Sequence, residues 1–434
     1  MEAARPPARA VTDRDRYRAF AASLTGTSLE YYDFAVYSSA AALIFGQLFF
    51  AAEDPLTGVF NAFATYAVGF VARPIGGIFF GRLGDVIGRK KVLVATLLLV
   101  GVATFLIGLL PTYDRVGMVA PALLVLLRFA QGVGVGGEWG GAVLLSSEMS
   151  EQGRRGFWAS AAQVGPPLGT LLANGVLAIL TVSLSDEAFL QWGWRVAFLL
   201  SAVLIGFGLW MRWAIEETPV FRALEARGAQ SHAPVSEVLA THRRGLAAAL
   251  LARIGPDVLY AMFAVFVLAY ATQQLGLSRA QAVSAVLLGS AIQVPVIPLA
   301  GLLSDRWGRK RVYAIGAVGG ALWSIGFLAL VGGFASLLIG VVGALILHAL
   351  MYGPQAAFIA EQFESRLRYT GSSLAYTFAG LVGGAIAPLA FSWMLARPSL
   401  IYLIGVYIAV ACAITLTGLM LGRAVADESD ATGV

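Results

Sequence analysis

Charged residues, cysteine and histidine are all scarce in this sequence. Asp, Glu, Lys and Arg together make up 13% of its 434 residues, whereas they account for about a quarter of an average soluble domain. A single cysteine, Cys412, excludes an intrachain disulfide and a multi-cysteine metal site. The three histidines, His232, His242 and His348, lack metal-ligand spacing. We therefore expect no metal ion and no other cofactor.

Patterns typical of catalysis and of nucleic-acid binding are also missing. Gly132-Val133-Gly134 superficially resembles a dinucleotide-binding loop, but it lies inside an apolar run and follows no strand. The net charge of +5 is spread over short loops and does not cluster on an exposed basic domain. No nucleophile with an adjacent base stands out. We therefore expect neither an enzyme nor a nucleic-acid-binding protein.

What the chain has in abundance is apolar sequence. Hydrophobic residues make up 58% of the chain, and its mean hydropathy is +0.77. Runs of about 20 apolar residues are long enough to cross the hydrocarbon core of a bilayer. Twelve such runs can be counted, at residues 21–49, 57–81, 91–110, 118–147, 157–183, 194–215, 245–274, 280–303, 312–332, 335–360, 371–395 and 399–422. We therefore predict an all-α integral membrane protein with twelve transmembrane helices.

A charged turn that contains glycine occurs twice. The sequence GRLGDVIGRKK at 81–91 returns as GLLSDRWGRKR at 301–311, so that Asp305 follows Asp85 by 220 positions. Repeats of this kind are typical of membrane bundles built from two related halves. We therefore predict two six-helix pseudo-repeat domains. The predicted division is a tail at 1–20, a domain at 21–215, a linker at 216–244, a second domain at 245–423 and a tail at 424–434.

The basic residues predict the orientation in the membrane. Twelve crossings place both termini on one side, and the loops on that side hold most of the arginines and lysines. The opposite loops hold only Arg115, Arg279 and Arg397, with Arg195 at an edge. By the positive-inside rule, both termini and both charged turns are cytoplasmic. The first 18 residues lack an apolar run with a cleavage site, so we predict a multi-pass protein of the cell membrane without a signal peptide.

Several motifs occur together over essentially the whole chain. These motifs are the two charged turns, RFAQG at 128–132, EYYDF at 30–34, RPIGG at 73–77, GGEW at 136–139, WGWR at 192–195 and EETP at 216–219. In these motifs the sequence resembles the major facilitator superfamily (MFS), and within it the metabolite:proton symporters that include shikimate, α-ketoglutarate and proline/betaine permeases. The resemblance implies the MFS fold and transport by alternating access between two domains.

Charged residues inside the apolar runs are candidates for proton coupling, since a charge at the bilayer centre costs about 2.5–3.5 kcal/mol. Glu30 and Asp33 share one helix face. Burial and mutual repulsion favour the protonated form of one of them, as a proton carrier requires. The alternative is a permanent ion pair with Arg73 that only positions helices. Arg128 resembles the superfamily arginine linked with proton coupling or anion attraction, and its alternative is a structural cation bonded to carbonyl groups.

Five further residues are candidates for a substrate cavity: Tyr37, Arg73, Glu138, Arg253 and Asp257. A guanidinium binds a carboxylate through two parallel hydrogen bonds, so Arg73, Arg128 or Arg253 would attract an acidic substrate. Two alternatives stay open. Arg253 and Asp257 are spaced for an ion pair within one helix, and Glu138 is equally suited to be a buried partner of Arg73.

The charged turns predict a gate on the cytoplasmic side. Asp85 can accept hydrogen bonds from the end of a helix in the other half, and Arg89 can reach Glu148. Pairs of this kind would hold the cytoplasmic side closed and separate when the halves rock. The candidate gate residues are Gly81, Asp85, Gly88, Arg89 and Glu148 in the first half, and Asp305, Gly308, Arg309 and Glu361 in the second. The alternative is that these charges only set the topology.

Together these features predict a proton-coupled secondary transporter that imports a small organic acid, such as a monocarboxylate, a dicarboxylate or a shikimate-like acid. One alternative is a proline/betaine-type osmolyte symporter, which the absence of coiled-coil heptads in 424–434 disfavours. A drug exporter is a second alternative, which the subfamily motifs disfavour. We expect a monomer whose partners are the acid, protons and the lipid bilayer.

Overall fold

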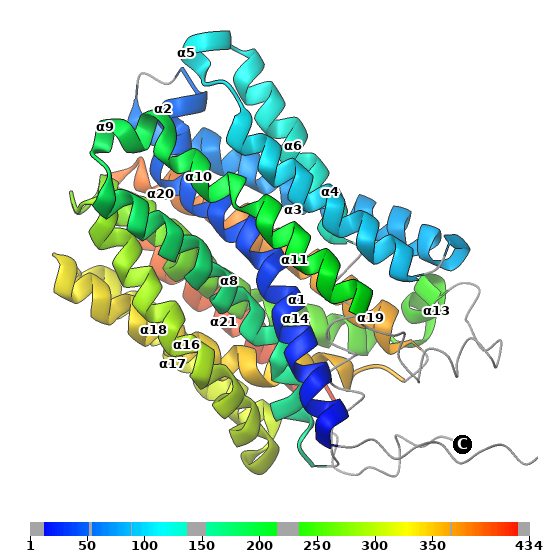
Figure 1. Ribbon diagram of the computed structural model, residues 1–434. Coiled ribbons are helices and arrows are strands. Elements are labelled where there is room, and N and C mark those ends of the chain that lie inside the picture. The colour runs from blue at the N-terminus through cyan, green and yellow to red at the C-terminus, as the bar shows by residue number, and fades with distance from the viewer. Residues whose placement is uncertain are drawn as a thin grey trace, which may run out of the picture.

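The computed structural model describes residues 13–51, 54–87, 89–136, 153–214, 234–364 and 367–423, and its regular structure in these ranges is helical throughout (Figure 1). Most of the helices are long and run roughly parallel to one another as a bundle (Figure 1). The predicted all-α class is confirmed.

The first half of the chain forms the part of the bundle coloured blue to green (Figure 1). Its helices are α1 (Asp13–Ala40), the π-helical η1 (Ala41–Phe45), α2 (Gly46–Phe49), α3 (Pro55–Ile87), α4 (Arg89–Leu109), α5 (Tyr113–Val116), α6 (Val119–Gly136), α8 (Arg155–Ser183), α9 (Asp186–Ala188), the π-helical η2 (Phe189–Gly193), α10 (Trp194–Leu199) and α11 (Ser201–Ala214).

The second half begins with a short helix inside the predicted linker. Its helices are α13 (Pro234–Thr241), α14 (Arg243–Tyr260), the π-helical η3 (Ala261–Phe266), α15 (Val267–Gln273), α16 (Arg279–Trp307), α17 (Arg309–Leu330), α18 (Phe334–Ala360), α19 (Arg368–Gly380), the π-helical η4 (Leu381–Ile386), α20 (Ala387–Leu395), the 3-10 helix η5 (Pro398–Leu400) and α21 (Leu403–Leu421).

The observed helices coincide with the predicted crossings. Nine helical stretches of the described chain are long and apolar enough to span a membrane. The remaining three predicted crossings fall on α1 with η1 and α2, on α4 and on α6. Residues 332–333 separate two crossings as predicted, since α17 ends at Leu330 and α18 begins at Phe334. The chain is a multi-pass membrane protein.

Local sequence explains several helix boundaries. At the start of α16 the Ser278 hydroxyl accepts a hydrogen bond from the Gln281 backbone, and the Gln281 side chain accepts one from the Ser278 backbone. Between α16 and α17 stands Gly308, whose φ of 90° favours glycine. Pro256 does not break α14, which continues to Tyr260 and then widens into η3. Such π-helical segments are often found at functional sites.

The two halves of the chain meet along two seams. In the first, α8 packs against α16, and a Cβ atom on Gly301 would lie 2.6 Å from the carbonyl oxygen of Gly156. In the second, α3 packs against η4, where Gly384 makes room for Phe70. Small residues let membrane helices approach this closely. Because of this contact, side chains of the two halves can bond directly.

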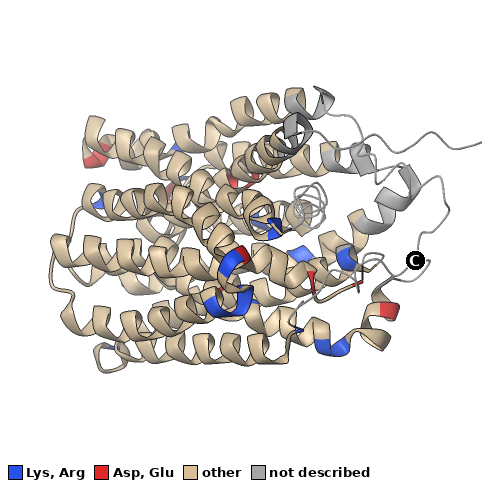
Figure 2. Ribbon diagram, turned by 90° about the horizontal axis from the view of Figure 1, so that it is seen from below, with Lys and Arg blue, Asp and Glu red and all other residues tan. Residues whose placement is uncertain are grey.

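The charged residues are distributed unevenly along the bundle. Arg306, Arg309, Lys310 and Arg311 surround the turn from α16 to α17, and blue patches are few along the rest of the described helices (Figure 2). We call the end of the bundle where α3 is followed by α4 and α16 by α17 the basic end. Long stretches of the helices between the two ends carry no charge (Figure 2). The few charges buried between the ends therefore mark the candidate site.

Candidate functional site

Arg128 of α6 is completely buried in a cage of aromatic rings. Its Cζ atom lies 4.3 Å from the ring centres of Phe34 and Tyr37 and 4.7 Å from that of Tyr66, and aromatic faces attract cations. Gly69 leaves the space for the side chain, because a Cβ atom there would lie 2.6 Å from its Nε. The Nη2 atom of Arg128 has no hydrogen-bond partner in the described part of the chain.

A polar chain leads from Arg128 to the acidic residues of α1. Arg128 Nη1 donates to Gln131 Oε1 at 3.0 Å, and Gln131 Nε2 donates to Thr104 Oγ1 of α4 at 2.7 Å. The buried carboxyl group of Asp33 lies against Thr104. Glu30, one turn earlier on α1, is also buried. Asp33 and Arg128 are thus connected through two neutral side chains.

Arg73 of α3 is buried between two phenylalanine rings. It is 4% exposed, and its Cζ lies 4.5 Å from the ring centre of Phe34 and 4.1 Å from that of Phe70. Its Nε has no hydrogen-bond partner among the described residues, and it makes no ion pair there with Glu30 or Asp33. The guanidinium reaches the second seam, since a Cβ atom on Gly380 would lie 3.9 Å from Nη1.

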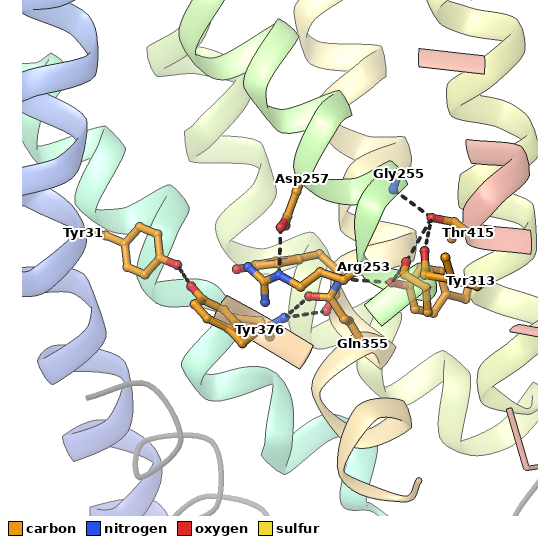
Figure 3. Close-up of polar contacts among 12 residues, drawn as sticks. Tyr31, Arg253, Gly255, Asp257, Tyr313, Gln355, Tyr376 and Thr415 are labelled. Atoms are coloured by element: carbon orange, nitrogen blue, oxygen red, sulfur yellow. Dashed lines mark hydrogen bonds and ion pairs between the residues drawn. The ribbon is translucent and has the colours of Figure 1, made fainter. Parts of the chain in front are cut away.

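Arg253 and Asp257 of α14 form the ion pair that their spacing allows. Arg253 Nε and Asp257 Oδ2 are 2.8 Å apart. The Arg253 guanidinium also lies on the ring of Tyr376, with Cζ 3.4 Å from the ring centre (Figure 3). The Asp257 side chain packs against Gly383 of η4. This pair is therefore intrahelical, and it packs on α19 and η4 of the same half.

Among the described residues, three hydrogen bonds between neutral side chains cross from one half to the other. The hydroxyl groups of Tyr31 and Tyr376 are bonded to each other (Figure 3). The hydroxyls of Thr170 and Tyr260 are 2.6 Å apart, and Gln163 Nε2 donates to Gln355 Oε1 at 3.0 Å. These bonds tie α1 to α19 and α8 to both α14 and α18. They would have to break for the halves to separate.

At the basic end, the second charged turn holds the start of a helix from the other half. The Asp305 carboxylate accepts hydrogen bonds from the backbone amides of Gly156 at 2.8 Å and Phe157 at 3.0 Å, at the start of α8. A negative charge is favourable at a helix N-terminus. Arg309 pairs with Asp305 at 2.8 Å and with Glu361 at 2.6 Å. This cluster closes the basic end on the side of α8 and α16.

A further ion pair joins the halves at the opposite end. Arg279 Nη1 at the start of α16 is 2.7 Å from Asp186 Oδ1 of α9. The Asp186 side chain is largely exposed, so the pair contributes little to stability. The halves are nevertheless in contact at both ends of the bundle.

The first charged turn is described only in part. Gly81 and Asp85 lie in the last turns of α3, and Arg89 begins α4, with positions described for the backbone alone. Gly88, Glu138 and Glu148 lie outside the described residues. Gly308 is the turn between α16 and α17. Tyr37 is placed beside Arg128, and its hydroxyl donates to Thr65 at 2.8 Å.

Sequence reasoning missed the neutral residues of the site. These are Thr104, Gln131, Tyr31, Tyr376, Gln163, Gln355, Thr170 and Tyr260. A buried charge stands out in an apolar run, whereas Thr, Gln and Tyr are common in membrane helices. The available signal was that such side chains seek partners on neighbouring helices, but the sequence does not tell which helices are neighbours.

The arrangement is suited to binding an anion and a proton. Three guanidinium groups, of Arg73, Arg128 and Arg253, are buried, and that of Arg73 reaches the second seam. Arg253 is paired with Asp257, while Arg73 is held only by aromatic rings in the described part of the chain. A buried cation without a counter-charge is costly. An incoming carboxylate would supply that counter-charge.

The sequence profile described as "Major Facilitator Superfamily" matches residues 19–388 and, in a second match, 257–433. The inner membrane metabolite transport protein YhjE of Escherichia coli is 37% identical over 94% of both chains. The shikimate transporter of the same organism is 38% identical over 86% of both chains. The proline/betaine transporter of E. coli is 32% identical over 94% of this chain and 83% of its own.

Solved structures are similar in fold at much lower sequence identity. The crystal structure of a D-xylose-proton symporter matches 94% of this chain and 97% of its own, with a TM-score of 0.73 and 16% sequence identity. This likeness, together with the profile match, confirms the predicted MFS fold. The relatives are membrane transporters, which confirms the prediction of a transport protein and not an enzyme.

Proposed function

The chain belongs to the Major Facilitator Superfamily, and from that premise we propose that it imports a small organic anion together with protons. The anion is a mono- or dicarboxylate or a hydroxylated cyclic acid. It binds between the halves and moves by alternating access in a monomer. The basic end faces the cytoplasm, and both termini lie there. Similarity to a shikimate transporter and to a metabolite transport protein supports an organic acid.

The observation that carries this proposal is the Arg73 guanidinium, whose contacts among the described residues are with aromatic rings. It is buried at the seam and contacts rings but no carboxylate in the described part of the chain. A carboxylate can accept two parallel hydrogen bonds from a guanidinium, one of them from the Arg73 Nε, which has no partner among the described residues. Arg128, which stacks on the same Phe34 ring, adds positive potential beside it. The site therefore favours an anion.

Asp33 is the proposed proton carrier. It is buried, one of its oxygens has no hydrogen-bond partner in the described part of the chain, and it lies against Thr104, which is linked to Arg128 through Gln131. A buried carboxyl group favours its neutral form. Protonation from one side and release to the other would couple transport to the proton gradient.

The proposal is tested by uptake into proteoliposomes. Labelled monocarboxylates, dicarboxylates, shikimate, proline and betaine are offered with and without an inward proton gradient. We expect one of the acids to accumulate, and the gradient to increase its uptake severalfold. Uptake of an acid at the same rate with and without the gradient would refute proton coupling but would still support the anion site.

An osmolyte symporter is the second candidate, because a proline/betaine transporter is 32% identical over 94% of the chain. Aromatic rings can hold a quaternary ammonium group, but here the rings around Arg73 and Arg128 already hold guanidinium groups. Two cations would repel the positive end of a zwitterion. If proline or betaine accumulated and none of the acids did, the substrate would be an osmolyte and not an organic acid.

A further inference from the structure

We infer that Thr104 and Gln131 are positioning residues that transmit the protonation state of Asp33 to Arg128. The inference rests on the proposed proton symport and assigns the two neutral side chains that link its proton site to its cation. Arg128, Gln131 and Thr104 are completely buried and come from α6 and α4, while Asp33 comes from α1. The direction of each hydrogen bond between Arg128 and Asp33 follows from which atoms can donate and which can accept.

The first two bonds have only one possible direction. An arginine carries donors and no acceptor, so the amide oxygen of Gln131 must face Arg128, as it does at 3.0 Å. The amide nitrogen of Gln131 then faces Thr104 and donates to its hydroxyl oxygen at 2.7 Å. Thr104 therefore acts as an acceptor toward Gln131. Its single proton must go elsewhere.

The Thr104 proton has two competing acceptors. In the structure it goes to the carbonyl oxygen of Val100, 2.9 Å away. The Asp33 carboxyl group lies against the same hydroxyl, and its Oδ1 has no hydrogen-bond partner among the described residues. Because the Thr104 hydroxyl donates its hydrogen bond to Val100, it can only accept a hydrogen bond from Asp33. That arrangement accommodates a protonated Asp33, which donates.

Ionisation of Asp33 reverses the last bond. The carboxylate then accepts the Thr104 proton, and the hydroxyl leaves the Val100 carbonyl. Each hydrogen bond from Arg128 to Asp33 then has its donor on the Arg128 side and its acceptor on the Asp33 side. This alignment stabilises the negative charge of Asp33, which in turn compensates the positive charge of Arg128. Protonation removes this compensation, so the positive potential around Phe34, shared by Arg73 and Arg128, attracts the substrate anion more strongly.

Few other titratable groups of the described chain lie beside Asp33. Glu30 and Tyr32 are the titratable groups that face it from its own helix. The Tyr32 hydroxyl donates to the carbonyl oxygen of Ala197 at 2.6 Å and so offers Asp33 no proton. In the described part of the chain, α4 contributes Thr104, and α6 contributes Arg128 through Gln131. Within the described part of the chain, this path leads from Asp33 to a cation.

The test is the pH dependence of counterflow, the exchange of labelled for unlabelled substrate at equal pH on both sides. Thr104→Val keeps the shape of the side chain and removes the bond to the carboxylate, so the ionised form is disfavoured. We expect the pH midpoint of exchange to move up by about one unit, a tenfold change in proton concentration. Thr104→Ser restores the hydroxyl and should restore the wild-type midpoint.

Two further variants separate this role from loss of packing. Gln131→Leu leaves Thr104 in place but cuts the path to Arg128, and we expect substrate affinity to lose most of its pH dependence. Ser324→Ala removes a buried hydroxyl with the same i−4 bond, here to Gly320 at 2.7 Å, and should change neither quantity. Residual exchange at low pH identifies variants that still fold.

A wild-type midpoint in Thr104→Val, or an equal shift in Thr104→Ser, would overturn the inference. The proposed function fails in a different way. If the wild-type protein itself shows no pH dependence, proton coupling is wrong and the assigned path falls with it. If the wild-type protein responds to pH and Thr104→Val responds identically, coupling stands and only the path is wrong.

Discussion

At the scale of single residues, the sequence marks the ionised groups of the site but not their partners. Glu30, Asp33, Arg73 and Arg128 stand out because charges are rare in apolar runs. The permanent ion pair between Arg73 and the acidic residues of α1 is not formed in the described chain, since Arg73 lies between Phe34 and Phe70. The sequence could not predict this, because cation–π contacts depend on how helices rotate against each other.

Substitution of Arg73 tests the anion site. Arg73→Lys keeps the charge but loses the planar, paired donors. We expect the substrate concentration for half-maximal counterflow to rise about tenfold to a hundredfold, as loss of a charged hydrogen bond implies, and Arg73→Gln to abolish exchange. Arg397→Gln is a matched control, because Arg397 also stacks on a ring, that of Trp393, at 4.1 Å, but at the surface. Normal affinity in Arg73→Lys would contradict the assignment.

Substitution of Asp33 tests the proton site. Asparagine cannot release a proton, so Asp33→Asn should abolish stimulation of uptake by the gradient while counterflow continues at all pH values. Asp54→Asn provides the control. Hydrogen bonds from Thr57 hold the pKa of the exposed Asp54 carboxyl below its usual value, so Asp54 stays ionised at neutral pH and its loss should leave coupling unchanged. Gradient-driven accumulation by Asp33→Asn would assign the proton to another group.

At the scale of helices, hydrophobic runs predicted nearly every boundary within a few residues. The π-helical segments η3 and η4 were not predicted, because one extra residue per turn leaves no mark in an apolar run. Their effect is local. Within η4, Gly383 and Gly384 receive the side chains of Asp257 and Phe70. The bonds between helices of opposite halves, such as that between Tyr31 and Tyr376, also required the packed structure.

The pair Tyr31 and Tyr376 tests whether these bonds restrain the halves. Tyr31→Phe and Tyr376→Phe each remove one hydroxyl, and Tyr376→Phe retains the ring on which Arg253 lies. We expect each variant to change the rate of counterflow severalfold with little effect on substrate affinity. Because both remove the same bond, the double variant should behave like either single one.

Additive effects in this cycle would show that the two hydroxyls act independently. A large loss of affinity in Tyr31→Phe alone would instead place Tyr31 in direct contact with the substrate. Thr272→Val is a suitable control in the second half. Its hydroxyl donates to the Leu268 carbonyl within the same half at 3.0 Å, so its loss should not alter the interaction between the two tyrosines.

At the scale of the whole molecule, the repeated turn predicted two related halves, and the second copy has its aspartate at the start of a helix from the first half. Asp305 does this at the basic end, and Arg279 with Asp186 joins the halves at the other. On the side of α8 and α16, the halves are thus in contact at both ends. The sequence alone could not predict which arrangement is adopted, since the same contacts must form and break during a transport cycle.

The balance between the two ends can be measured by cysteine labelling. Ser160 of α8 is completely buried beside Gly301 at the basic end, so a cysteine there reacts with a maleimide only when this end opens. Cys412 is replaced by serine to give a background without thiols. Asp305→Asn removes a charge from the start of α8 and the ion pair with Arg309, and a loss of about 1–2 kcal/mol should raise the labelling rate of Ser160→Cys about tenfold.

Asp186→Asn acts at the opposite end and should have the reverse effect. It weakens the contact with Arg279 and favours opening there, which leaves the basic end closed for more of the time. Because that pair is exposed, the fall in labelling at Ser160→Cys should be smaller than the rise caused by Asp305→Asn. If both variants raised labelling, they would be loosening the fold in general. If instead Asp305→Asn raises the labelling rate and Asp186→Asn lowers it, the protein exchanges between a state closed at the basic end and a state closed at the opposite end. Each ion pair then stabilises the closed state of its own end.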